Sequence, residues 1–413
     1  MARDKAYYEA EKKIEEALLE GATELDLSNM KLTELPELLG QLTQLQSLNI
    51  SDNRLTTLPE SLGGLKWLQS LNIGSNLILV PPKWIGKLKR LKKLNLSNNL
   101  LIAFPNQFGK LKQLQTLNLA GNQPIEIPES LGNVTRLQIL DLSNNQLKIL
   151  PDSLGHLAQL QSLNLSNNRL TELPASLTEL IQLQLLILFK NQLITLPESL
   201  GQLGQLQELN LYSNQLKSLP ESLGQLTQLQ KLNLSNNQLE SLPESLGQLT
   251  QLQELNPSSN QLKSLPKSLG QLTQLQELNL SSNQLKSLPK SLGQLIQLQE
   301  LNLSGNHLKL LPKLLRQLTQ LKGLNLRSNQ LKSLPDWFGS SLIELQSLTL
   351  AGNRLITLPP SLNQLVKLQF LFVQENELSI LPNDFGNMAQ LQNINLLIIN
   401  LTISHLPLAN LNI

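Results

Sequence analysis

The stretch Leu229–Pro243 reads LQKLNLSNNQLESLP, and it decides the fold of the chain. Leu232 and Leu234 alternate with polar residues, which places both leucines on one face of a short strand. The pair Leu242 and Pro243 then requires a compact turn or 3₁₀ segment that brings the chain back. Each copy of this pattern therefore predicts one coil of a solenoid.

The pattern recurs along almost the whole chain with a period of 23 residues. Its register is fixed by asparagines, which stand at Asn53, Asn76, Asn99, Asn122, Asn145, Asn168, Asn191, Asn214, Asn237, Asn260, Asn283, Asn306, Asn329, Asn353 and Asn376. Degenerate units at Leu25–Pro36 and Leu391–Leu401 have Met30 and Ile399 in the Asn position. One unit buries too little apolar surface to offset its own chain entropy, so stacking must supply the stability. We predict a solenoid of about 17 units over residues 22–401.

On these motifs the chain resembles the leucine-rich-repeat family over nearly its whole length. The LP-x-x-L half of the unit looks like the 23-residue intracellular class found in Ras-suppressor-like scaffolds and many bacterial proteins. The opening, EAEKKIEEALLEGATELDLSNMKLTELPE, is similar to the start of the repeat region in bacterial Roco GTPases. The resemblance implies an α/β-type solenoid, a horseshoe with a parallel concave sheet and an irregular or 3₁₀ convex side.

The repeated Asn is interpreted as part of the scaffold. Buried polar groups need hydrogen-bond partners, and an Asn amide can pair with backbone N–H and C=O groups at the bend and on the adjacent coil. Function is therefore expected where a unit departs from its neighbours.

The outward strand positions are usually Ser, Glu or Lys, then Asn, then Ser, and two apolar departures from this pattern are candidate contacts. The eighth unit becomes apolar there, and the predicted protein contact consists of Leu185, Ile187, Phe189, Lys190 and, one coil on, Tyr212. Exposed apolar side chains on a polar sheet favour a protein partner, with repeat drift or cover by another segment as the alternatives. Phe370 and Phe372 form the second candidate contact, unless the C-terminal tail covers them.

Charge is balanced over the whole chain, with 33 basic and 31 acidic residues and a net charge of +2, so we expect no nucleic-acid partner. The densest basic run is Lys83, Lys87, Lys89, Arg90, Lys92 and Lys93. It could bind nucleic acid or anionic lipid, but no broader basic stripe and no aromatic residue beyond Trp84 accompanies it, which favours a solvated surface.

An acidic column is expected on the outward strand face at Glu208, Glu254, Glu277 and Glu300, interrupted by Lys231. It would attract a basic peptide or form a solvated stripe. Nine residues after each column position the charge is reversed, with Glu240 following Lys231, which hints at compensation within each unit.

The ends and one strand break the pattern. Residues 1–21 are predicted to form a helical cap, since Tyr7, Ala10, Ile14 and Leu18 have helical spacing within 6–18. Residues 402–413 are predicted to be an irregular tail, and the last core has no comparable polar cap, which favours self-association. Pro257 replaces a strand Leu and predicts a ladder defect between the tenth and eleventh units.

The sequence offers no motif for catalysis. There is no Cys, no Gly-rich Lys-Ser or Lys-Thr loop, and the three His lie at unrelated positions, so we expect neither an enzyme nor a metal or cofactor site.

The opening residues lack a signal pattern, and no segment is apolar enough to span a membrane. We predict a cytoplasmic scaffold for a protein partner. The alternatives are a self-assembling protein, an orphaned regulatory segment of a Roco-like GTPase, or a bacterial effector.

Overall fold

The fold is that of a coil repeated along the chain. The computed structural model describes residues 5–379 and 390–395, and the chain divides into two compact units, Met1–Leu209 and Asn210–Ile413. In each unit every coil contributes one short strand and, in nearly every case, one short helix.

The strands are three residues long and pair in parallel. In the first unit β1 to β8 pair in sequence order, and in the second unit β10 to β17 do so. The middle residue of each strand is in register with that of the next, and it is Leu in every strand except β17, where it is Ile394. Their bounds are β1 (Glu24–Asp26), β2 (Ser47–Asn49), β3 (Ser70–Asn72), β4 (Lys93–Asn95), β5 (Thr116–Asn118), β6 (Ile139–Asp141), β7 (Ser162–Asn164), β8 (Leu185–Ile187), β9 (Glu208–Asn210), β10 (Lys231–Asn233), β11 (Glu254–Asn256), β12 (Glu277–Asn279), β13 (Glu300–Asn302), β14 (Gly323–Asn325), β15 (Ser347–Thr349), β16 (Phe370–Phe372) and β17 (Asn393–Asn395).

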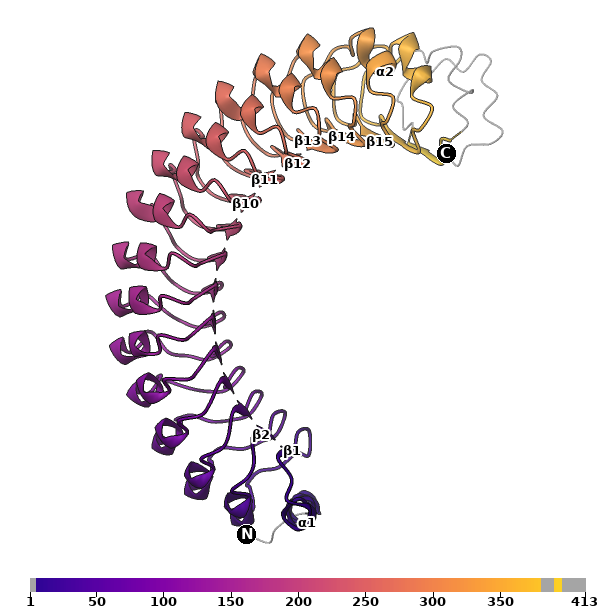
Figure 1. Ribbon diagram of the computed structural model, residues 1–413. Coiled ribbons are helices and arrows are strands. Elements are labelled where there is room, and N and C mark those ends of the chain that lie inside the picture. The colour runs from indigo at the N-terminus through magenta and orange to yellow at the C-terminus, as the bar shows by residue number, and fades with distance from the viewer. Residues whose placement is uncertain (1–4, 380–389, 396–413) are drawn as a thin grey trace. The chain divides into compact units, whose positions relative to one another are not determined.

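Short helices return the chain to the next strand. Most are 3₁₀ helices: η1 (Glu37–Gln41), η2 (Glu60–Gly64), η3 (Lys83–Lys87), η4 (Asn106–Lys110), η5 (Glu129–Asn133), η6 (Asp152–His156), η7 (Ala175–Glu179), η8 (Glu198–Gln202), η9 (Glu221–Gln225), η10 (Glu244–Gln248), η11 (Lys267–Gln271), η12 (Lys290–Gln294), η13 (Lys313–Gln317) and η14 (Pro360–Gln364). The unit with one extra residue forms the α-helical turn α2 (Trp337–Ser341) instead. In each unit the strands lie on the inner side of the curve and the helices on the outer side (Figure 1), so the predicted fold class is confirmed.

The Leu-Gly step of the outer helices has a steric cause. A Cβ atom added at Gly132 would collide with the carbonyl oxygen of Ser153 on the next coil, and Gly247 meets Ser268 in the same way. The outer sides of neighbouring coils approach too closely for a side chain there, which explains why Gly recurs after the helix Leu.

The repeated Asn ties each coil to the one before it. Asn237 is buried, and its side-chain amide donates to the carbonyl oxygens of Leu211 and Leu234, each at 3.0 Å. Its Oδ1 accepts the N–H of Leu216 at 3.0 Å. Equivalent bonds are made in the first unit, for example by Asn145. The side chain thus satisfies backbone groups that would otherwise be buried without partners.

The first helix, α1 (Lys5–Glu20), packs against η1 at the start of the first unit. It buries Tyr7, Ala10 and Ile14 as the spacing predicts, but the last buried position is Ala17, whereas Leu18 is partly exposed. Among the described residues, no helix is long and apolar enough to cross a membrane. The predicted tail, 402–413, and Ile399 of the last degenerate unit lie outside the described residues.

Pro257 does interrupt the ladder, but on the other side from the one predicted. In ordinary coils the residue after the strand donates its N–H to the next coil, as Leu234 does to the carbonyl of Asn256 and Leu280 to that of Asn302. Pro257 has no N–H to donate, and β11 and β12 pair only at their first two residues. The defect therefore lies between the eleventh and twelfth coils, and the prediction of the tenth and eleventh was wrong.

Candidate functional site

The outward face of each strand is set by alternation. The middle residue is buried, and the first and third residues point outward. In most strands the third residue is Asn or Asp, and its Oδ1 accepts the backbone N–H two residues further on, at 3.1 Å from Asn164 to Ser166 and at 3.0 Å from Asn233 to Ser235. The Oδ1 atom at this position therefore closes the turn after the strand.

Strand β8 departs from this arrangement. Leu185 and Ile187 are half-buried on either side of the fully buried Leu186, and Ile187 stands in register with Asn164. Ile187 has no side-chain acceptor, so within the described part of the chain the N–H of Phe189 has no hydrogen-bond partner. We call Leu185, Ile187 and Phe189 the β8 surface.

The side chain of Phe189 is also more exposed to solvent than that of the residue it replaces. The corresponding Ser166 in the preceding coil is only 2 % exposed and closes onto Asn164 at 2.8 Å, whereas Phe189 remains half-exposed. The β8 surface is thus an apolar area on the strand face of the first unit, where Ile139 of β6 is a further exposed apolar residue. The side chains of Leu185 and Ile187 have the orientation that the sequence predicts. A role in partner binding stays a prediction.

Lys190 follows the β8 surface at a position that is left-handed in most coils. Its φ is 53°, and the equivalent residues include Ser213, Asn167 and Gly121. Gly and Asn adopt this conformation most readily, and a long side chain such as Lys is less common there. The eighth coil therefore keeps an exposed cation at a position that favours a smaller residue.

The other predicted contact residues lie in the second unit. Tyr212 is 36 % exposed, and its N–H still bonds to Asn210 at 3.1 Å, so only its side chain departs from the repeat. Phe370 is 38 % exposed on β16, and Phe372 replaces the Asn that would close the turn. A joint contact of Tyr212 with the β8 surface stays a prediction, as does binding at β16.

Two ion pairs in the second unit join neighbouring coils. Lys231 forms an ion pair with Glu254 of the next coil, and Lys263 pairs with Glu240 at 3.7 Å. Compensation within one unit stays a prediction. Glu277 stands beside Glu300 in register, and burial together with the charge of Glu277 raises the pKa of the Glu300 carboxyl.

The aromatic residue predicted to accompany the basic run is not at the surface. Trp84 lies in η3 and is only 1 % exposed, so its side chain cannot contact a ligand. The exposed aromatic is Trp67 of the preceding coil, over which Arg90 lies at 3.6 Å from the ring.

One surface in the first unit has no counterpart in the sequence predictions. It is apolar and exposed on three successive coils, at Leu77, Leu79, Val80, Leu100, Ile102 and Ile125. These residues follow the ladder Asn, where the common units have Gln, Lys and Ser. The replacement of Gln-Leu-Lys-Ser by Leu-Ile-Leu-Val after Asn76 is the signal that could have identified it.

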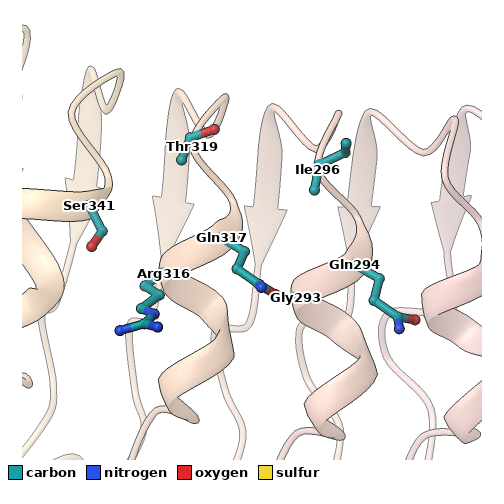
Figure 2. A pocket seen from close by; sticks show the side chains of 7 residues that line it. All are labelled: Gly293, Gln294, Ile296, Arg316, Gln317, Thr319 and Ser341. Atoms are coloured by element: carbon teal, nitrogen blue, oxygen red, sulfur yellow. The ribbon is translucent and has the colours of Figure 1, made fainter.

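The hollows seen in the described part of the chain are open to solvent. Figure 2 shows one of about 750 Å³ in the second unit, between neighbouring outer helices, lined by residues that include Arg316, Gln317 and Thr319. Arg316 is its one ionisable lining residue. No group of His, Cys, Asp or Glu in the described ranges could hold a metal ion.

Comparisons with known proteins agree with this geometry. The family model of the leucine-rich repeat region matches residues 24–126, 128–215 and 195–310, and the leucine-rich-repeat model matches residues 320–341. A search of curated protein sequences gives no match.

Among solved structures, the chain is similar to a leucine-rich-repeat protein of Leptospira interrogans, with 39 % identity, a TM-score of 0.86 and coverage of 92 % of this chain and 98 % of that one. It is also similar to the plant peptide hormone receptor RGFR1 in complex with RGF2, with 29 % identity, a TM-score of 0.70, and coverage of 91 % and 74 %. An internalin of Listeria monocytogenes matches with 28 % identity, a TM-score of 0.66, and coverage of 74 % and 87 %.

Proposed function

Because the chain belongs to the leucine-rich-repeat family, we propose that it is a scaffold that binds a protein partner on its strand face, with the β8 surface as a principal contact. The observation that carries the proposal is the replacement of Asn by Ile187. It removes the side-chain bond that closes the turn in ordinary coils and puts an apolar side chain in its place. A substitution that gives up a stabilising bond for a partly exposed apolar group is the pattern expected of a binding residue.

The comparisons support a polypeptide as the partner. The plant peptide hormone receptor RGFR1 is solved in complex with RGF2, and the match covers 91 % of the present chain. Phe189 adds an aromatic anchor, the residue class that dominates binding energy at interfaces. Lys190 adds an exposed positive charge beside it, which would orient a partner more than it would strengthen the complex.

The test is partner capture with a variant that restores the common repeat. Leu185→Ser, Ile187→Asn and Phe189→Ser together reproduce the ordinary strand face, as seen at Ser162, Asn164 and Ser166. After chemical crosslinking in extracts of the source organism, we expect a protein enriched on the wild type to be lost from this triple variant.

The control is Ile181→Thr, which removes an exposed apolar residue from the same coil, away from the strand, and also restores a common repeat residue. It should retain the partner. Equal recovery of every captured protein on the wild type, the triple variant and the control would exclude the β8 surface as the contact.

The finer assignments are part of the same proposal. We infer the 23-residue intracellular class and a cytoplasmic location, since the period is 23 and the chain has no Cys. Similarity of the opening sequence to Roco proteins predicts a nucleotide-binding loop encoded downstream in the gene.

Self-association through the C-terminal end predicts a molecular mass that rises with concentration in light scattering, and a constant monomer mass would exclude it.

A further inference from the structure

The middle of the first unit is strongly polarised in charge. Residues 61–125 contain nine Lys and Arg and no Asp or Glu, although the whole chain is nearly neutral. All nine of these side chains are exposed, and none forms a salt bridge within the described residues. Such a concentration of one sign creates a local field that attracts an anionic partner.

Stacking of the coils brings lysines that are 23 residues apart in the sequence side by side. Lys66, Lys89 and Lys112 occupy the same place on three successive coils, at the turn between the outer helix and the strand. The Nζ of Lys89 donates to the carbonyl of Lys110 at 3.3 Å, and the Nζ of Lys112 donates to that of Asn133 at 2.8 Å. These bonds align two of the ammonium groups along one edge of the first unit, which we call the basic edge.

The basic edge continues onto the strand face. Lys92 and Lys93, at the start of β4, line a hollow of about 350 Å³ together with Gln46, Gln69, Ser47 and Ser70, and Glu24 lies at its β1 end. The side-chain amide of Gln69 donates to that of Gln46 at 3.1 Å. Amide and hydroxyl groups of this kind can hydrogen-bond a polypeptide backbone, while the two ammonium groups suit carboxylates.

We propose that the basic edge and this hollow bind an acidic segment of a polypeptide. A nucleic acid fits less well, because Trp67 is the one exposed aromatic here and Arg90 already covers one face of its ring. A membrane surface fits less well, because Trp67, whose ring Arg90 covers on one face, is the one large apolar side chain exposed next to Lys66, Lys89 and Lys112 in the sequence. This surface is separate from the β8 surface and does not depend on it.

The probe is a fluorescently labelled peptide of alternating Glu and Ser, with binding measured by anisotropy. Lys66→Thr, Lys89→Thr and Lys112→Thr together restore the Thr found at Thr43 and Thr135 in neighbouring coils, so the fold is preserved. We expect the triple variant to weaken binding at least about tenfold, and we expect wild-type binding to fall as salt is raised.

The matched control removes three lysines from outer helices of the second unit, Lys267→Gln, Lys290→Gln and Lys313→Gln, for the same change in net charge. It should bind the peptide like the wild type. Equal weakening in both triple variants would mean that only net charge matters and would overturn the proposal.

Two further probes distinguish the class of anion. Oligothymidylate and phosphatidylserine vesicles, tested at the same charge concentration, should bind more weakly than the peptide. Gln46→Ala with Gln69→Ala should weaken the peptide more than the other two probes, since a polypeptide backbone can use both the donors and the acceptors of these amides. Tighter binding of either other probe, or no effect of the Gln substitutions on the peptide, would overturn an acidic polypeptide as the partner.

Discussion

The coil of β8 in the first unit and the coils of β12 and β13 in the second unit share one framework and differ on one face. In both regions the ladder Asn is buried and bridges to the preceding coil, as Asn191 does to Leu165 at 2.9 Å and Asn306 does to Leu280 at 2.9 Å. The outward residues of β12 and β13 are Glu and Asn, whereas those of β8 are Leu185 and Ile187. The framework therefore leaves the outward face free to change, and β8 is a strand where both outward residues have changed.

The largest expected effect lies in the framework of the second unit. Asn237→Ala would leave the carbonyls of Leu211 and Leu234 and the N–H of Leu216 without this partner. Because buried groups without partners are costly, the free energy of unfolding in urea should fall by about 2–5 kcal/mol. Gln238→Ala, at the next residue, should change it by less than about 0.5 kcal/mol. Similar losses in the two variants would remove the distinction between framework and surface.

The next effect concerns the interrupted ladder in the second unit. Pro257→Leu restores an N–H that can donate to the carbonyl of Asn279, so the unfolding free energy should rise by about 1–2 kcal/mol. The reverse change, Leu280→Pro, removes the bond from Leu280 to Asn302 and should lower it. Thermal melting of both variants measures this, and a Pro257→Leu variant less stable than the wild type would contradict the account of the defect.

A smaller and reciprocal pair of changes compares β8 with its neighbour β7. Ile187→Asn supplies an acceptor for the N–H of Phe189 and should stabilise the fold by about 1 kcal/mol. Asn164→Ile removes the acceptor used by Ser166 and should destabilise it by a similar amount. Urea unfolding of the two variants should give changes of opposite sign, and changes of the same sign would show that turn closure is not what distinguishes the strands.

The smallest effect is electrostatic and lies on β13. Since burial and the neighbouring Glu277 raise the pKa of Glu300, its ionised form is less stable in the folded than in the unfolded protein. Glu300→Gln should therefore stabilise the protein slightly at neutral pH, and the advantage should disappear as the pH falls below the carboxyl range. Unfolding at several pH values, with Glu240→Gln as the control, tests this. An advantage that grows on acidification would have the wrong sign.

The sequence predicts the fold because the framework is periodic. Leucine alternation and the 23-residue Asn register give parallel strands, outer turns and the orientation of Leu185 and Ile187. Other features depend on contacts between coils that one unit does not contain. The loss of turn closure at Ile187 appears only once Asn164 is seen bonded to Ser166, and the direction of the Pro257 defect depends on which neighbouring coil accepts the bond.

The candidate binding surfaces also combine features that the sequence predicts with features that depend on how the coils stack. The basic run is visible in the sequence, but its extension through Lys66 and Lys112 depends on stacking, and the sequence gives no reason to prefer the exposed Trp67 over the buried Trp84. The apolar positions on the three coils from Leu77 to Ile125 depart from the repeat by composition alone. This apolar surface could have been predicted by comparing every position of the repeat between units, and not the strand positions alone.

Hydrogen exchange of the protein bound to its captured partner tests the central claim most directly. Peptides covering residues 183–190 and 275–303 report on the β8 coil and on the uniform coils. We predict that the partner slows exchange in 183–190, including the otherwise unbonded N–H of Phe189, and leaves 275–303 unchanged. Slower exchange in 275–303 with none in 183–190 would contradict the claim that departures from the repeat form the binding surface.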